Sequence, residues 1–339
     1  MIKISSRIPT DRVVVHWQVS KFCEKDCHYC TAYNFKISVN KGKNVVSYTD
    51  ERIALDDKIA ELLPQVVKKG NILLFGGEPT LHPKGIEYFN ELCRVTRDNP
   101  DVTIFLVTHG DIEEEKICAI NTHGKKEHII SISYHYYQVN FPLWLEKVKL
   151  FHKNNNVIAS AIIPRRRIVW KQFEQNMRVL LDSGIPTELK SELDNLTNAP
   201  DHIGLQRFRD MYYEAANTRG EFLNSYYVNE LYLEEGNRKE VVPDVEVLND
   251  IPLMPGKSIC NNRQFAITEN VFKFSCDEGG QLILTQDTTA EQLLEFVGKN
   301  TITCTKSHCT ETRQIPATIR VFGKTLDDPE YKDFLNTRL

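Results

Sequence analysis

Three cysteines stand close together near the amino-terminal end, in the segment FCEKDCHYC at 22–30. They are Cys23, Cys27 and Cys30, with three residues between the first pair and two between the second. A structural zinc site usually takes four ligands arranged as two close pairs. An iron–sulfur cluster held by three closely spaced thiolates keeps one iron open for another ligand. The spacing therefore favours an iron–sulfur cluster, with a zinc site as the alternative.

Six apolar, strand-like runs alternate with stretches of helical period, and the cysteines directly follow the first run. The runs occupy 12–19, 71–77, 102–110, 128–134, 156–163 and 185–193, and the helical stretches occupy 50–67, 86–97, 144–154 and 170–183. This alternation predicts an α/β fold with a parallel sheet covered by helices. Active sites in such sheets lie at the carboxyl ends of the strands. The cysteines therefore stand where a functional site is expected.

A second motif follows the second run. The segment LLFGGEPTLHP at 73–83 contains Gly76, Gly77, Glu78 and Pro79. Together with the CxxxCxxC spacing and the aromatic Tyr29 before the last cysteine, this GGEP sequence resembles the radical S-adenosylmethionine (radical SAM) superfamily. The resemblance implies an enzyme with a partial (β/α)6 barrel in which the three cysteines hold a [4Fe–4S] cluster. It also implies that the open iron binds SAM, whose reductive cleavage gives a 5′-deoxyadenosyl radical that abstracts hydrogen from the substrate.

The resemblance also implies further contacts to SAM. Gly76 and Gly77 would let the backbone approach the methionine part of SAM, where a Cβ atom would obstruct it. Glu78 lies near the cofactor in this interpretation, or else it caps the following helix. The stretch from Thr108 to Gly110 resembles the TNG sequence of the family with His109 in place of Asn, which leaves a turn role and a binding role open.

Polar positions on the fourth and fifth runs extend this set. Ser131, Ser133 and His135 share one face by period two, and Ser160 is the matching position on the fifth run. Such residues could reach the ribose or carboxylate of SAM, or they could be ordinary polar positions inside a barrel. The predicted cofactor-binding residues are Tyr29, Gly76, Gly77, Glu78, Pro79, Thr108, His109, Ser133 and Ser160.

The candidates for catalysis lie near the ends of two runs. The aromatic stretch SYHYYQVNFPLW at 133–144 is expected to form a strand end and a loop at the rim where substrate enters, which makes Tyr134 and His135 candidates. Lys190 and Glu192 share one face of the sixth run. Because burying charged groups is costly unless something binds there, these two residues are candidates for contact with the substrate or with SAM.

Four more cysteines lie in the last eighty or so residues, at Cys260, Cys276, Cys304 and Cys309. Their spacing resembles the shortened auxiliary-cluster domain, the Twitch type, of certain radical SAM enzymes, and it departs from the longer seven-cysteine SPASM form. The resemblance implies one auxiliary [4Fe–4S] cluster, and a zinc ion on four thiolates is the alternative. The segment SICNNRQFAITENVFKFSC at 258–276 is predicted to form a hairpin around the turn TEN.

These patterns divide the chain into three predicted segments. Residues 1–193 form the radical SAM core, 194–255 form a bridge, and 256–339 form a small α+β auxiliary-cluster domain with a carboxyl-terminal tail. The bridge is expected to contain a helix at 202–216 and a hairpin with EEGN at its turn.

Composition limits the partners. The formal net charge of −4 gives no general electrostatic reason for binding nucleic acid or a membrane surface. No window approaches eighteen uninterrupted apolar residues, the length typical of a membrane span. We therefore expect a cytoplasmic protein whose nine cysteines stay reduced or bind metal.

The substrate is the least determined part of the prediction. About a dozen residues precede the first run, which leaves no room there for a peptide-recognition domain. We therefore expect a small polar metabolite such as a sugar, an aminocyclitol or a nucleoside-like compound, with dehydrogenation, epimerisation or carbon–carbon bond formation all open. The alternatives are a peptide-modifying enzyme with a separate recognition protein, a tRNA-modifying enzyme and a non-catalytic metal protein. A flavodoxin- or ferredoxin-type electron donor is implied by the family resemblance.

Overall fold

The structure is a computed structural model of the whole chain. It describes residues 2–6, 12–25, 27, 30, 37–38, 47–124, 128–192, 202–218, 231–235, 238–242, 258–260, 264–274, 280–298, 302–304 and 320–322. Among the predicted site residues, Tyr29, Cys276 and Cys309 lie outside these ranges.

The chain forms two compact units, which are described separately. The barrel unit comprises 15–220 and 267–270, and the terminal unit comprises 1–14, 221–266 and 271–339. These bounds differ from the three predicted segments, because the amino-terminal residues group with the carboxyl-terminal part and helices of the predicted bridge group with the barrel.

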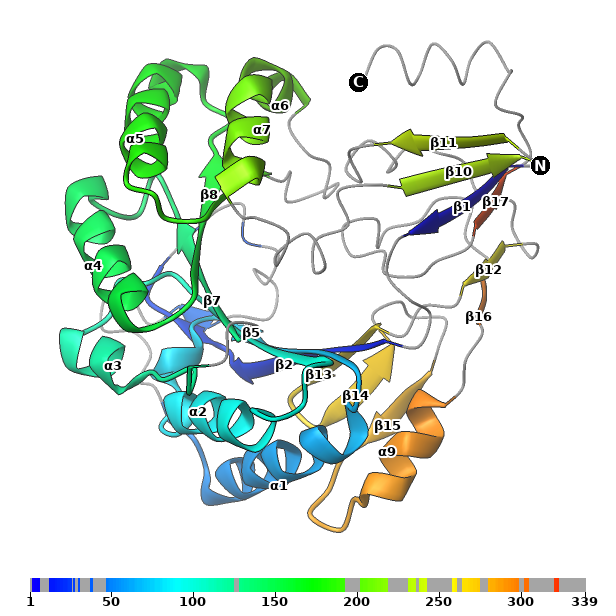
Figure 1. Cartoon of the computed structure of the whole chain (residues 1–339). Coiled ribbons are helices and arrows are strands. Elements are labelled where there is room, and N and C mark those ends of the chain that lie inside the picture. Colours follow the sequence, from blue (N-terminus) through cyan, green and yellow to red (C-terminus); the bar gives the residue numbers. More distant parts are fainter. Residues whose placement is uncertain are drawn as a thin grey trace. The chain divides into compact units, whose positions relative to one another are not determined.

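The barrel unit contains the predicted six-fold βα alternation. Its strands lie in the order β2 (Val13–Ser20), β5 (Gly70–Gly76), β6 (Val102–Thr108), β7 (Ile129–Tyr134), β8 (Val157–Ile163) and β9 (Thr187–Ser191). From β5 to β9 each strand pairs in parallel with the next. The outer face of the sheet is covered by α1 (Asp50–Val66), α2 (Gly85–Val95), α3 (Glu114–Ala119), α4 (Phe141–Asn154) and α5 (Trp170–Asp182) (Figure 1). The α/β fold class predicted from the sequence is confirmed.

The described part of the barrel unit also contains shorter elements. They are β3 (Phe22–Cys23), β4 (Ile37–Ser38), the 3-10 helices η2 (Pro79–Leu81) and η3 (Arg167–Val169), and the helices α6 (His202–Arg207) and α7 (Arg209–Thr218). The single helix predicted at 202–216 is therefore two short helices. Among the described residues, no helix is both long and apolar enough to cross a membrane.

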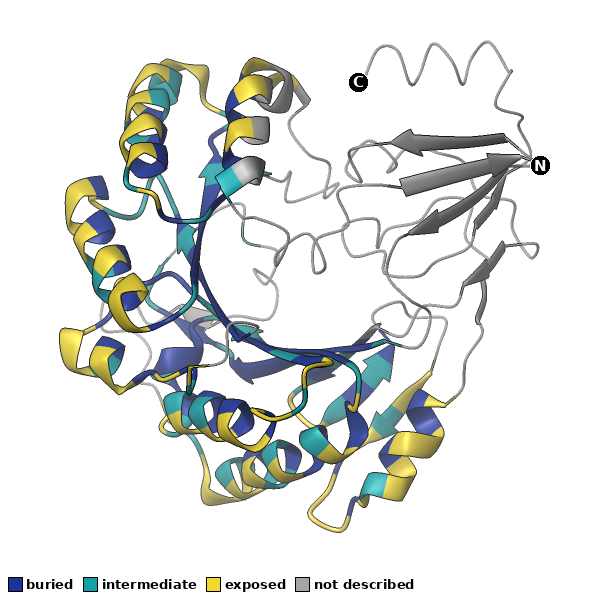
Figure 2. Ribbon diagram, in the orientation of Figure 1, coloured by how far each residue is buried: buried dark blue, intermediate teal, exposed yellow. Residues whose placement is uncertain are grey.

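The core lies between the sheet and its helices (Figure 2). Strand β7 shows how alternation divides the two faces, because Ile130, Ile132 and Tyr134 are buried toward the helices while the serines between them face inward. The ring of Tyr134 contacts the rings of Trp144 and Phe173, and its hydroxyl accepts a hydrogen bond from Asn176 at 2.8 Å. Tyr134 is thus a core residue that packs on the helix side of the sheet, away from the inner face where the serines lie.

The described residues of the terminal unit form antiparallel strands and one helix. Strands β1 (Ile2–Ser6), β10 (Leu231–Glu235), β11 (Arg238–Val242) and β17 (Arg320–Phe322) form a sheet in the order β11-β10-β1-β17. The hairpin predicted around EEGN is confirmed by the pairing of β10 with β11. Strand β1 was not predicted, because both of its partners lie more than two hundred residues away in sequence.

A second hairpin in this part of the chain also follows the prediction. Strand β13 (Gln264–Thr268) is followed by β14 (Val271–Phe274), with Glu269 at φ 55° in the turn, and β14 pairs with β15 (Gln281–Ile283). Phe265, Phe272, Phe274 and Phe296 of α9 (Ala290–Val297) pack their rings together as a small core.

Candidate functional site

The three-cysteine loop begins where β2 ends. Cys23 and Cys27 are buried and Cys30 is half-buried. The backbone N–H of Lys25 donates to the Sγ atom of Cys23 at 3.3 Å, and the N–H of Cys30 donates to the carbonyl oxygen of Cys27 at 3.2 Å. Among the described residues, no three Cys, His, Asp or Glu side chains converge closely enough to hold a metal ion. The donor set itself, three thiols on one short loop, suits a cluster that keeps one iron open.

The glycine pair of the second motif lies against the backbone that leads into this loop. The N–H of Gly77 donates to the carbonyl oxygen of Ser20 at 2.8 Å, and the N–H of Glu78 donates to that of Phe22 at 2.6 Å. A Cβ atom on Gly76, which has φ 142°, would lie 2.0 Å from the Ser20 oxygen, and one on Gly77 would lie 2.1 Å from the Phe22 oxygen. Only glycine permits this approach, so the second motif supports the first directly.

Glu78 joins the ends of two neighbouring strands. Its side chain is fully buried and caps η2, accepting from the backbone N–H of Thr80 at 3.1 Å and from the Thr80 hydroxyl at 2.7 Å. It also accepts from the Thr108 hydroxyl at 2.9 Å and from the N–H of His109 at 2.9 Å. A carboxylate accepts roughly four hydrogen bonds, so those of Glu78 are all made within the protein. The capping alternative for Glu78 is therefore realised in the structure.

His109 connects Glu78 to the cysteine loop. Its Nε2 atom lies 3.0 Å from a carboxylate oxygen of Glu24 and 3.3 Å from one of Glu78, and Glu24 stands between the first two cysteines. The N–H of Asp111 donates to Nδ1 at 3.0 Å, which places the ring proton on Nε2 between the two carboxylates. Burial alone would lower the pKa of His109, but the attraction of Glu78 and the hydrogen bond to Glu24 outweigh it and raise that pKa.

Asp111 provides a second anchor for the loop. Its carboxylate lies 2.6 Å from the Nζ atom of Lys25 in the cysteine loop and 2.6 Å from that of Lys147 on α4. Partial burial opposes ionisation, but the two lysines outweigh it and lower the pKa of Asp111 to about 2. The segment after β6 therefore holds the cysteine loop through both His109 and Asp111.

The inner face of the sheet carries a row of polar residues across three strands. Ser133 on β7 pairs with Ser160 on β8, which pairs with Glu188 on β9. Ser160 is 1% exposed, and its hydroxyl has no hydrogen-bond partner among the described residues. Glu188 is buried beside Lys190, whose Nζ atom lies 2.5 Å away. The sequence interpretation missed Glu188, although it continues the period-two pattern of Lys190.

The remaining candidates have distinct surroundings. Glu192 is buried and accepts from the backbone N–H of Arg165, in the loop after β8, at 3.0 Å. His135 is half-buried directly after β7. A residue that was not predicted, His16, lies on β2 with its ring 5.8 Å from that of Phe75, and burial lowers its pKa to about 4. His16 is therefore a neutral imidazole near neutral pH.

Two of the four carboxyl-terminal cysteines lie in described strands of the terminal unit. Strand β12 (Ser258–Cys260) pairs with β16 (Ile302–Cys304), with Cys260 opposite Ile302 and Ser258 opposite Cys304. Cys260 and Cys304 are thus diagonal positions of one ladder, where residues share a face.

The fold and the site together define a class of α/β proteins that carry a three-cysteine loop at the carboxyl end of the first barrel strand. The family model of the Radical SAM superfamily matches residues 17–198, which is just over half of the 339 residues. The chain belongs to the radical SAM superfamily.

Comparison with solved structures gives similar structures at low sequence identity. One, titled "Native anSMEcpe with bound AdoMet", has a TM-score of 0.47 and 17% identity, and the match covers 83% of this chain and 80% of that chain. Another, titled "Native anSMEcpe with bound AdoMet and Cp18Cys peptide", has a TM-score of 0.47 and 17% identity, covering 83% and 79%. No curated protein matches the sequence.

Proposed function

We propose that this radical SAM enzyme abstracts hydrogen from a small polar metabolite such as a sugar, an aminocyclitol or a nucleoside-like compound. Cys23, Cys27 and Cys30 would hold the [4Fe–4S] cluster to which SAM binds. When bound, cluster and SAM supply a 5′-deoxyadenosyl radical that starts dehydrogenation, epimerisation or carbon–carbon bond formation. The proposal rests mainly on one observation: hydrogen bonds join the cysteine loop to the segments that follow β5 and β6.

The residues around the loop have a positioning role in this proposal. Gly76 and Gly77 bring the end of β5 against the backbone before Cys23, and Glu78 ties that end to the end of β6. His109 then ties the end of β6 back to the loop through Glu24. A loop held on two sides keeps its thiols in place, and small displacements of reacting groups cost large factors in rate.

The polar row on the inner face supports a polar ligand. An unpartnered buried hydroxyl costs about 1–3 kcal/mol, and a bound hydroxyl or amine would remove that cost at Ser160. Ser133, Ser160 and Glu188 would therefore contact the ribose of SAM or the polar groups of the substrate. Lys190 would orient the carboxylate of Glu188 through their ion pair.

A second cluster belongs to the same proposal. Cys260, Cys276, Cys304 and Cys309 would hold one auxiliary [4Fe–4S] cluster with no open iron, which suits electron transfer or a structural role. The first cluster would receive its electron from a flavodoxin- or ferredoxin-type donor in the cytoplasm, where thiols remain reduced.

The decisive experiment measures SAM cleavage by anaerobically reconstituted protein. Replacing Cys23, Cys27 and Cys30 with Ala should abolish formation of 5′-deoxyadenosine, because no cluster would remain at the site. The matched control is Cys118→Ala, an exposed cysteine on α3, which should keep the wild-type rate. Full cleavage by the triple variant would rule the proposal out.

The substrate class is tested by isotope transfer. The enzyme is incubated with a deuterated cell extract that has been separated into a small-molecule fraction and a peptide fraction. Mass spectrometry then measures deuterium in 5′-deoxyadenosine, which marks the fraction that donates the hydrogen atom. Deuterium from the small-molecule fraction is expected, and deuterium from the peptide fraction alone would favour the peptide-modifying alternative.

A further inference from the structure

One hydrogen bond joins the two ends of the segment that carries the three cysteines. The hydroxyl of Tyr48 donates to the Oγ atom of Ser20 at 2.8 Å, although the two residues lie 28 positions apart in sequence. Cys23, Cys27 and Cys30 all lie between them in the chain. Burial raises the pKa of Tyr48 to about 12, so its hydroxyl is protonated near neutral pH and donates this bond. The segment is therefore closed at its base by two side chains.

Ser20 passes this contact on to the residue before the first cysteine. Its Oγ atom accepts from the backbone N–H of Phe22 at 3.1 Å and donates to the Phe22 carbonyl oxygen at 3.3 Å. A serine hydroxyl that bonds the backbone two residues on forms a local turn, which here directly precedes Cys23. Ser20 is 1% exposed, so these bonds are shielded from water. The conformation of the chain that enters the cysteine loop therefore depends on the Ser20 hydroxyl.

The ring of Tyr48 packs between that turn and the second motif. It meets the ring of Phe22 edge-on at a centroid distance of 5.4 Å and the ring of His82 edge-on at 4.4 Å. Aromatic rings at such separations favour this edge-to-face arrangement. The orientation of the buried His82 is fixed, because Nδ1 accepts from the N–H of Lys84 at 3.1 Å and Nε2 lies 3.3 Å from the carboxylate of Asp56. Tyr48 thus packs against a fixed ring of the second motif.

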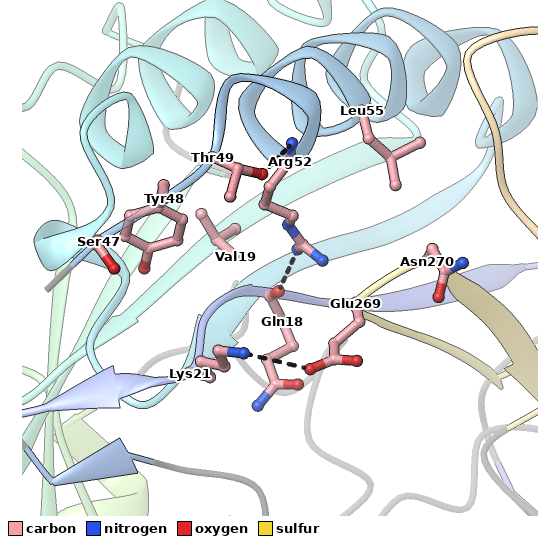
Figure 3. Close-up of a pocket in the computed structure, with 10 residues that line it drawn as sticks. All are labelled: Gln18, Val19, Lys21, Ser47, Tyr48, Thr49, Arg52, Leu55, Glu269 and Asn270. Carbon is pink, nitrogen blue, oxygen red and sulfur yellow. Dashed lines mark hydrogen bonds and ion pairs between the residues drawn. The ribbon is translucent and has the colours of Figure 1, made fainter.

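Helix α1 holds Tyr48 from its other side. The Thr49 side chain accepts from the backbone N–H of Arg52 at 3.2 Å and caps the amino-terminal end of this 17-residue helix. Such a cap stabilises the first helical turn. Tyr48 directly precedes the cap and lies beside the start of α1 (Figure 3). The position of the Tyr48 hydroxyl is therefore set by a helix outside the cysteine loop.

We propose that Tyr48 is a positioning residue for the SAM-binding cluster. Through Ser20 and Phe22 it determines where the cysteine loop leaves β2. This inference rests on the proposed function, because it assigns Tyr48 a task only if the cysteines of that loop hold the cluster. Tyr48 acts through Ser20 and is not a catalytic residue. Since small displacements of reacting groups cost large factors in rate, loss of its hydroxyl should slow SAM cleavage more than it weakens the binding of SAM.

The test compares Tyr48→Phe with the wild type, both reconstituted anaerobically as the full chain. The variant keeps the ring and loses only the hydroxyl. Its kcat for SAM cleavage, divided by its iron content, should fall at least about tenfold. Its KM for SAM should change less than about threefold, because the hydroxyl is bonded to Ser20 and does not contact SAM. Iron should also pass to an added chelator several-fold faster, because the base of the loop opens more readily.

Tyr88→Phe is the matched control. The ring of Tyr88 also contacts that of His82, at 5.3 Å, and its hydroxyl bonds Asp57 on α1 at 2.9 Å. None of its hydrogen bonds or ring contacts reaches the described part of residues 20–30. This variant should keep the wild-type kcat and rate of iron release even where its thermal unfolding midpoint falls. A role in stability alone would give the same result for both tyrosines.

A double-mutant cycle with Ser20→Ala tests the route of the effect. Ser20→Ala removes the acceptor, so it should lower kcat by itself, and adding Tyr48→Phe should change kcat by less than about twofold more. A further fall of about tenfold in the double variant would show that Tyr48 acts by another route.

That result would overturn the proposal, as would equal kcat and equal iron release in the wild type and Tyr48→Phe, or equal losses in Tyr48→Phe and Tyr88→Phe. A wild type that binds iron at the loop but does not cleave SAM would contradict the proposed function. The rate of iron release would then still test the role of Tyr48.

Discussion

At the scale of single residues, the site depends on one imidazole placed between two carboxylates. His109 lies within 3.0 Å of Glu24 and 3.3 Å of Glu78, and the first of these carboxylates is part of the cysteine loop. Adding a proton to the ring displaces the N–H of Asp111 from Nδ1, which costs about 1 kcal/mol for a neutral hydrogen bond. Attraction to two carboxylates in a buried site is larger, so the raised pKa of His109 prevails.

This residue gives a pH-dependent prediction. The pKa of His109 is raised above its ordinary value of 6.5, so its stabilising contribution is complete below pH 6.5 and is lost as the pH rises through the folded-state pKa. The variant His109→Gln keeps a donor but cannot titrate. The free energy of unfolding of the wild type should therefore exceed that of this variant by on the order of 1 kcal/mol near pH 6, and the difference should shrink toward pH 9. Thermal unfolding at each pH measures it.

The control for this measurement is His152→Gln, an exposed histidine on α4, which should show no such trend. A difference between the wild type and His109→Gln that stays constant from about pH 6 to 9 would contradict the charged state of His109.

At the scale of elements, the end of β5 supports the cysteine loop through backbone contact. Gly77 and Glu78, which directly follow β5, donate to the carbonyl oxygens of Ser20 and Phe22. The backbone after β5 therefore remains hydrogen-bonded to the chain beyond the end of β2. The short strand β3 then ends at Cys23. The position of the first thiol is therefore determined by how closely these two backbones approach.

A substitution at Gly77 tests this contact. Its Cβ atom would lie 2.1 Å from the Phe22 oxygen, a separation that forces backbone movement. Gly77→Ala should therefore lower the iron bound at the first site by at least about half, and should destabilise the chain by more than about 1 kcal/mol. Iron analysis and thermal unfolding measure the two effects.

Gly184→Ala is the matched control. Gly184 has φ 72° but nothing within 4 Å of an added Cβ atom, so the variant has backbone strain without a clash. It should lose about 1 kcal/mol of stability and keep its iron. Equal iron loss in both variants would show that general destabilisation, and not the contact with the loop, accounts for the effect.

At the scale of the whole molecule, the chain carries two groups of cysteines in two units. Three lie on the cysteine loop of the barrel unit, and four lie in the terminal unit, where strand pairing sets Cys260 and Cys304 on one ladder. If both groups hold four-iron clusters, reconstituted protein should contain about eight irons per chain.

Replacing Cys304 and Cys309 with Ala should lower the iron content to about four per chain, because only the auxiliary cluster loses its ligands. Cleavage of SAM without substrate should continue, while turnover of substrate should be lost. Circular dichroism must first show that the variant folds, since metal binding and folding are coupled in such modules. Four irons together with one zinc in the wild type would instead support the zinc alternative for the terminal unit.

Much of the barrel unit could be predicted from sequence because its signals are local. Each of the segments that form β2, α1 and β5 spans no more than about twenty residues. The two motifs are likewise short contiguous segments. Period-two patterning also placed Ser133 and Ser160 on one face of neighbouring strands, which the pairing of β7 with β8 confirms.

Other features depended on contacts between distant residues, and only the tertiary structure decided them. Tyr134 follows Ser133 by one residue, so strand alternation turned it toward Trp144 and away from the inner face. The sequence left a turn role and a binding role open for His109, and its contact with Glu24, eighty-five positions earlier, is visible only in the structure. The sequence by itself determined which chemical groups and elements this chain contains, because those follow from local spacing. The tertiary structure decided which of the groups meet, because burial and hydrogen bonding join residues that no local pattern relates.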